Sequence, residues 1–241
     1  MDLLRFLHGL VPPPGVAPRA ALLALVVGVA GSIWVSVLRD GGMRVAYTRK
    51  IFHFVIFTAA AVVHALWDLP GTVVFGTVIA AMVVAALVRG EGHPFYEALA
   101  RERDRPHRSL FILVPLLTTA VGGLLSALLA GPYAIVGYLA AGWGDAVGEP
   151  VGARWGRRPY PVPSLAGVAA TRTVEGSAAV FLVSTVAVAA GLAAIGTEAA
   201  LWWAAPVCGV TAAAVEAVSH HGLDNLTVQL VPSLVALFLL A

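Results

Sequence analysis

The chain has 241 residues, of which 59% are hydrophobic and 12% are charged, with a mean hydropathy of +0.89. A soluble domain of this length carries about twice that charged fraction, so the composition excludes a soluble protein and predicts an integral membrane protein. The formal net charge is only +2 and the basic residues lie in short connections, which excludes a nucleic-acid partner. The single cysteine, Cys208, excludes a disulfide framework within one chain.

The chain is expected to form one membrane-embedded domain, 1–241, that begins with a short interfacial segment, 1–19. Leucine and phenylalanine side chains there form one face of a brief helix, which three prolines at 12–14 end. Eight apolar segments follow, each near the roughly 20 residues that a bilayer-spanning helix needs. Their expected bounds are about 20–38, 50–68, 70–88, 109–130, 132–154, 174–195, 198–218 and 223–241. The predicted fold class is therefore an all-α bundle of seven to eight transmembrane helices.

Basic residues alternate between the connections of this bundle. Thirteen of the fifteen lysines and arginines lie in or beside three connections, near 39–50, 89–108 and 154–172, and the turns between these carry none. Cytoplasmic loops of membrane proteins carry such an excess. We therefore expect these loops and the connection at 220–221 to face the cytoplasm, with both termini outside, in a cell or organellar membrane.

Two carboxylates lie inside the fifth apolar segment. Asp145 and Glu149 are four residues apart, which places them on one side of a helix, and Asp145 is roughly 13 Å from its basic end. A charged acid near the bilayer centre costs about 2.5–3.5 kcal/mol, so such residues face a cavity or a partner. With no basic residue in the same helix core, the pair suits Mg²⁺, which binds one or two carboxylates together with substrate phosphates. The alternative is a structural pair that shares a proton or hydrogen-bonds to another helix.

Glycines recur every four residues along the same helix, at Gly144, Gly148, Gly152 and Gly156. They form a smooth stripe on which another helix can pack closely. Most of them are expected to serve packing, so that a close neighbour brings its own polar groups to Asp145.

A basic loop at 155–173 leads into the sixth apolar segment. Its prolines at 159, 161 and 163 exclude a continuous helix, and Thr171 or Thr173 can cap the helix that follows. A helix N-terminus suits phosphate through its free N–H groups, and an arginine adds a forked donor. The candidate phosphate-binding residues of this region are Arg154, Arg157, Arg158, Arg172, Thr173, Gly176 and Ser177.

Glu175 lies in the first turn of the sixth segment and is a third candidate catalytic carboxylate, beside Asp145 and Glu149. The stretch from Thr171 to Glu175 is also close to a capping box, so a capping role is an equal alternative.

Two further groups complete the candidate site. Lys50 and His53 open the second segment one turn apart and can both contact phosphate, although a histidine at an interface can also be a simple anchor. The last hairpin carries three polar residues that suit either contact with a lipid head group or a structural role, for example as a helix cap. They are Glu216, Asp224 and Asn225.

Four stretches, in this order, resemble one known family. RKIFH at 49–53 resembles its Arg-Lys-x-x-His, and GDAVGEPVGARWG at 144–156 resembles its Gly-Asp-x-x-Ala-x-x-x-Gly-x-x-x-Gly element. TRTVEGSAAVF at 171–181 is similar to its Lys-Ser-x-Glu-Gly-Ser-x-Ala-x-Phe, and EAVSHHGLDNLTVQL at 216–230 resembles an ending of the phytol kinase-like branch. The family is that of dolichol kinases, phytol kinases and CTP-dependent diacylglycerol kinases. Arg172 stands where the family commonly has Lys, and Gly148 where it has Ala.

The resemblance implies a Mg²⁺-dependent membrane kinase. It would transfer the terminal phosphate of CTP, or of another nucleoside triphosphate, to the hydroxyl of a long-chain isoprenoid alcohol of the phytol, polyprenol or dolichol type. Asp145 would hold the metal with help from Glu149 or Glu175, and catalysis would rest on positioning and charge neutralisation. The alternatives are a diacylglycerol kinase, a phosphatidate cytidylyltransferase-like enzyme that releases pyrophosphate, and a transporter that uses the acids as an ion relay.

Overall fold

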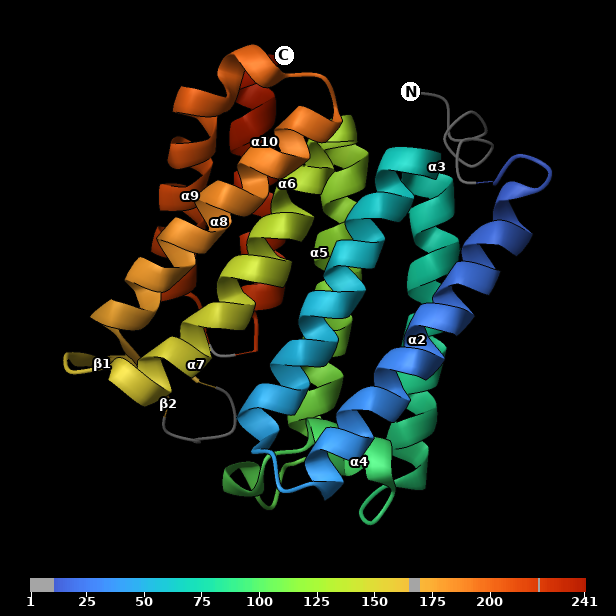
Figure 1. Ribbon diagram of the computed structural model, residues 1–241, viewed down its shortest axis with the longest axis vertical. Coiled ribbons are helices and arrows are strands. Elements are labelled where there is room, and N and C mark those ends of the chain that lie inside the picture. The colour runs from blue at the N-terminus through green and yellow to red at the C-terminus, as the bar shows by residue number, and fades with distance from the viewer. Residues whose placement is uncertain (1–10, 165–169, 221) are drawn as a thin grey trace.

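The computed structural model describes residues 11–164, 170–220 and 222–241. Its long helices stand side by side in one bundle (Figure 1). The expected interfacial helix near the N-terminus falls at 1–10, outside the described residues, as does His221. The helices are α2 (Val16–Asp40), α3 (Val45–Arg89), α4 (Pro94–Leu99), η1 (Glu102–Asp104), α5 (Leu110–Ala130), η2 (Gly131–Tyr133), α6 (Ala134–Leu139), η3 (Ala140–Asp145), α7 (Ala146–Trp155), α8 (Val174–Ala194), η4 (Glu198–Ala200), α9 (Leu201–Val218) and α10 (Asp224–Leu240).

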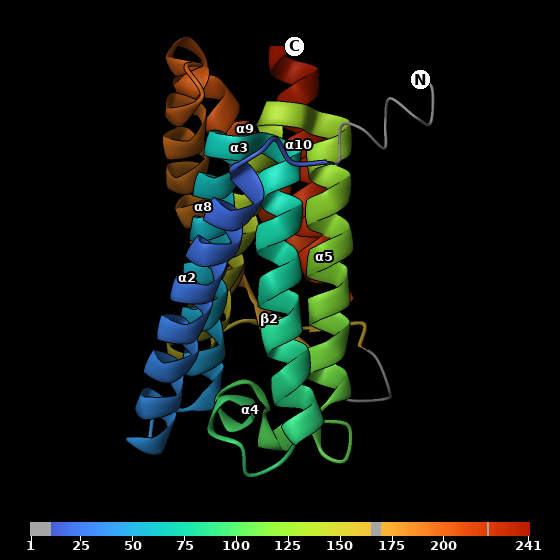
Figure 2. The ribbon, with the colours of Figure 1, turned by 90° about the vertical axis from the view of Figure 1, so that its right-hand side faces the viewer.

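Two long helical runs reverse direction at the end of the bundle where the C-terminus lies (Figures 1 and 2). Within α3, Asp68 has φ 50° and ψ −153°, which interrupts the helix just before Pro70. Gly131, with φ 54°, separates α5 from the descending run of α6, η3 and α7. Each run therefore has two antiparallel arms.

The composition of the helices agrees with a membrane protein. Among the described residues, five helical runs are long and apolar enough to cross a membrane, and Asp224–Leu240 is a shorter apolar helix. The five are Val16–Asp40, Val45–Arg89, Leu110–Trp155, Val174–Ala194 and Glu198–Val218. This is the all-α membrane fold that the sequence predicts. The number of eight spans stays a prediction. It requires that each of the two arms of 45–89, and each of the two arms of 110–155, crosses the membrane separately.

The glycine stripe packs as expected. A Cβ atom on Gly148 would lie 2.6 Å from Cγ2 of Val180, and one on Gly152 would lie 2.8 Å from Oγ1 of Thr173. At Gly144 it would overlap Oγ of Ser184. The absence of side chains at these glycines thus lets α7 and η3 approach α8 closely.

The loop at 155–173 contains a two-stranded ribbon, which corrects the purely helical prediction. Strand β1 (Pro159–Val162) pairs antiparallel with β2 (Ala170–Thr173), so that Tyr160 lies opposite Arg172. Proline is disfavoured in the interior of a helix, but it is tolerated in a strand of this kind, one edge of which stays unpaired.

The three basic connections gather at one end of the bundle, which we call the basic end. The loops after α2, α3 and α7 all lie at the end opposite the C-terminus, together with α4 and the ribbon (Figure 1). This clustering is the arrangement that the alternation of basic residues predicts.

Candidate functional site

A polar cavity of about 260 Å³ lies at the basic end. Its walls come from the start of α3, the η1 loop, α7, β2, the first turn of α8, the end of α9 and the start of α10. Ten predicted site residues line it. They are Lys50, Asp145, Glu149, Arg172, Thr173, Gly176, Ser177, Glu216, Asp224 and Asn225.

The two carboxylates of the fifth apolar segment converge on one cation. Asp145 ends the short π-helix η3, a rare conformation that occurs often at functional sites. Its Oδ2 is 2.8 Å from Nζ of Lys50, and both residues are buried, 6% and 8% exposed. The same Nζ lies 3.9 Å from Oε2 of Glu149. The expected shared face is therefore present, and α3 supplies the basic partner that the helix itself lacks.

The loop at 89–108 closes over Glu149. Oε1 of Glu149 is 3.2 Å from Nη1 of Arg101 and 3.1 Å from Nη2 of Arg103. Arg101 in turn donates to Asp104 at 2.8 Å, which fixes its guanidinium. These two arginines are site residues that the sequence analysis misses, since a loop arginine is explained equally well by topology alone.

A second ion pair braces the same loop. Arg108 donates to Glu97 at 2.6 Å and Gly92 N–H donates to it at 2.9 Å. Burial opposes ionisation of Glu97, but these hydrogen bonds prevail and lower the pKa of its carboxyl. The loop that carries Arg101 and Arg103 is thus held at the cavity by charge.

Arg172, on β2, lines the cavity and contacts the end of α9 and the start of α10. Its Nε is 2.6 Å from Oε1 of Glu216, and its Nη2 is 2.8 Å from Oδ2 of Asp224. Its Nη1 donates to the backbone oxygens of Ser219, at 3.0 Å, and of Glu216. All three nitrogen atoms therefore have protein acceptors, and Arg172 ties β2 to the α9–α10 hairpin besides lining the cavity.

The first turn of α8 faces the cavity with a capped N-terminus. Oγ1 of Thr173 accepts from the N–H of Gly176 at 3.0 Å, which is one of the two caps that the sequence predicts. Oγ of Ser177 lies 2.6 Å from the hydroxyl of Tyr160. The positive end of the helix dipole and its N–H groups suit an anion such as phosphate.

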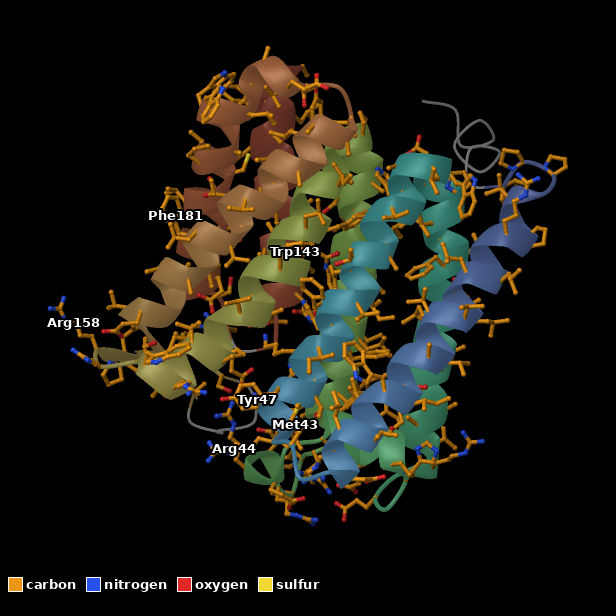
Figure 3. The ribbon with its side chains drawn as sticks, in the orientation of Figure 1. Met43, Arg44, Tyr47, Trp143, Arg158 and Phe181 are labelled. Atoms are coloured by element: carbon orange, nitrogen blue, oxygen red, sulfur yellow. The ribbon has the colours of Figure 1, made fainter. Side chains whose placement is uncertain are left out.

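Five predicted residues are not among the described residues that line the cavity: His53, Arg154, Arg157, Arg158 and Glu175. The three arginines are exposed, and Figure 3 shows Arg158 directed away from the bundle. Glu175 accepts from the backbone N–H of Arg157 at 3.0 Å and of Arg158 at 3.3 Å. These contacts favour a role for Glu175 in fixing the loop onto α8.

His53 lies between the cavity and the apolar interior. Its Nε2 donates to the carbonyl of Ala141 at 3.1 Å and is 3.7 Å from Oδ2 of Asp145. The ring stacks on Phe57 at 4.3 Å. His53 therefore supports the π-helix that carries Asp145, rather than standing in the polar cavity.

Arg49 is a cation of the cavity wall with an unmet hydrogen bond. Its Nη1 is buried and has no hydrogen-bond partner among the described residues. A buried donor left without a partner is costly, so an anionic ligand at this point would stabilise the site. Arg49 stands in the stretch at 49–53 singled out above, where Lys50 and His53 were the expected contacts.

Asp145 and Glu149 are the described side chains that would hold the expected magnesium ion. Asp145 and Glu149 both reach the point now taken by the Lys50 ammonium group. No three His, Cys, Asp or Glu side chains gather around a common point within the described ranges. Oxygens of phosphate and water would therefore complete the coordination, as is usual for Mg²⁺.

A sequence comparison with known proteins shows the family of this chain. A phytol kinase from Synechocystis sp. is 30% identical over 192 residues, which cover 78% of this chain and 77% of that protein. The chain belongs to the phytol and polyprenol kinase-like family. The alignment is long enough that the family resemblance extends beyond the short motifs to most of the bundle. No family model and no solved structure matches the chain.

Proposed function

We propose that this protein is a membrane kinase that phosphorylates the hydroxyl of a long-chain isoprenoid alcohol, with CTP or another nucleoside triphosphate as donor. The observation that carries the proposal is the pairing of buried Asp145 with partly buried Glu149 in a cavity walled by Arg49, Lys50 and the N-terminus of α8. Carboxylates for a metal and cations for phosphate are the parts that phosphoryl transfer requires. The kinship with a phytol kinase supports the lipid alcohol as acceptor.

The chemistry follows from these parts. The alcohol oxygen forms a bond to the terminal phosphorus, the bond from that phosphorus to the bridging oxygen breaks, and the nucleoside diphosphate leaves with that oxygen. The alcohol proton passes to water in the cavity. Mg²⁺, when bound by Asp145 and Glu149, would neutralise charge on the phosphates. Arg49 and the α8 N-terminus would orient them, with the basic end on the cytoplasmic side where nucleotides are available.

Position-specific labels separate this reaction from its alternatives. The purified protein is incubated with CTP labelled in either the γ- or the α-phosphate, and with phytol, a polyprenol or diacylglycerol. A kinase moves only the γ-label into the lipid, whereas a cytidylyltransferase moves the α-label and releases pyrophosphate. Transfer to diacylglycerol but not to the isoprenoid alcohols would overturn the proposed acceptor, and no transfer to any of them would overturn the function. Replacing CTP by ATP, GTP or UTP identifies the donor.

A further inference from the structure

An apolar groove of about 100 Å³ lies beside the polar cavity, between α3, α5 and the end of α4. Phe52, Ile56 and Phe57 line it from one face of α3, and Ile112 and Leu116 line it from α5. Ile56 and Leu116 are only partly buried, so the groove reaches the outer surface of the bundle. The groove therefore offers an apolar path from that surface toward the interior.

The groove and the polar cavity meet at two residues. Arg49 and Asn225 line both of them. Asn225 is held in place because its Nδ2 donates to Oγ1 of Thr119 at 2.9 Å. Arg49 brings the buried Nη1 that lacks a partner among the described residues. A cation with an unmet hydrogen bond thus stands at the point where an apolar path ends and a polar cavity begins.

We propose that this groove holds the hydrocarbon chain of the lipid alcohol, and that Arg49 contacts the phosphate where the alcohol hydroxyl meets it. The proposal rests on the kinase function proposed above and adds where the acceptor binds. A long-chain alcohol needs apolar contacts directly beside its hydroxyl, and a nucleotide needs a cation at its terminal phosphate. The junction at Arg49 and Asn225 offers both. From Arg49 to Phe57, α3 rises about 12 Å. The hydrocarbon chain of the lipid would therefore run from the basic end into the apolar part of the bundle.

A larger side chain in the groove should weaken the binding of long alcohols and leave the binding of short ones unchanged. Leu116→Trp places a larger side chain in the groove, while Leu117→Trp adds the same side chain to a neighbouring position that is 54% exposed. We expect Leu116→Trp to raise the KM for a twenty-carbon isoprenoid alcohol at least about tenfold. Its KM for the nucleotide and its rate with a five-carbon prenol stay unchanged, and Leu117→Trp behaves as wild type. Equal loss with long and short alcohols, or no loss with either, would overturn the proposal.

A binding measurement on the wild-type protein does not depend on turnover or on the folding of a variant. An isoprenoid alcohol that carries a diazirine on its chain is photo-crosslinked in nanodiscs, and the labelled peptides are mapped. Label on 51–57 and 111–119 that excess phytol displaces supports the groove even if no phosphate is transferred, in which case the kinase function fails alone. Two results would overturn the inference even if the protein is a kinase. One is label on other peptides. The other is label in the groove that phytol does not displace, which would mean that bulk lipid occupies it.

Discussion

At the scale of single residues, the site is a set of buried charges that neutralise one another. Lys50 joins Asp145 to Glu149, Arg172 joins Glu216 to Asp224, and Arg101 joins Asp104 to Glu149. Removing one member of a buried pair leaves an uncompensated charge, which is strongly destabilising. A variant here must therefore be assayed for folding as well as for rate.

Asp145→Asn removes the charge that is best placed for metal and phosphate chemistry. We expect at least about a hundredfold loss of phosphoryl transfer. We also expect a lower melting temperature, because buried Lys50 then keeps only Glu149, at 3.9 Å, as its anionic partner. Asp40→Asn, an exposed acid at the same end, is the matched control. If Asp145→Asn keeps more than about a tenth of the wild-type rate, which is a loss below 1.4 kcal/mol, Asp145 has no part in the metal site.

Glu175→Gln separates a catalytic acid from a loop anchor. Its carboxylate accepts from the N–H groups of Arg157 and Arg158, and an amide oxygen can still accept from them. We expect turnover within about threefold of wild type, with a melting temperature lower by a few degrees for a loss of about 1 kcal/mol. A fall in rate comparable to that of Glu149→Gln, at an unchanged melting temperature, would return Glu175 to the catalytic set.

At the scale of elements, the site depends on how closely two helices approach. Asp145 and Glu149 are carried by η3 and α7, and the glycine stripe sets these against α8, whose N-terminus faces the same cavity. Any side chain that separates α7 from α8 would also move the carboxylates away from the proposed phosphate site. Packing and chemistry are therefore coupled through the glycines.

Gly148→Ala measures this coupling, because the new Cβ would meet Cγ2 of Val180 at 2.6 Å. We expect a loss of about 1–3 kcal/mol in stability from overpacking, seen as a lower melting temperature in detergent. The double variant with Val180→Ala should recover most of that loss, because it removes the methyl group that clashes. Gly76→Ala in α3 is the control, since nothing lies within 4 Å of its Cβ position. An equal loss at Gly76 and Gly148 would show that the contact with Val180 is not its cause.

At the scale of the whole molecule, patterns with a local physical cause could be predicted and long-range pairings could not. The apolar segments, the clustering of basic loops and the packing of Gly148 follow from composition and period. The partner of Asp145 does not, because Lys50 is 95 residues away and only the tertiary fold brings it within 2.8 Å. The sequence likewise predicts Arg154 and Arg158 as phosphate ligands, because spacing alone does not give the direction of a loop side chain. In the structure Arg158 points outward just before β1, and Arg172 on β2 lines the cavity.

The orientation of the molecule in the membrane is predicted by the basic end. Arg44, Arg103 and Arg157 belong to the connections at this end, whereas exposed Glu198 begins η4, which joins α8 to α9 at the other end (Figure 1). A cysteine is introduced at each of these four positions in turn. The native Cys208 is fully buried, so it gives no background to a membrane-impermeant thiol reagent. Since short cytoplasmic loops carry the excess of arginine and lysine, we expect the first three cysteines to react only in opened vesicles and the Glu198 cysteine to react in intact cells. Reaction of any one of the first three in intact cells would place part of the proposed nucleotide site away from the nucleotide pool, and the kinase proposal would then need a different cavity.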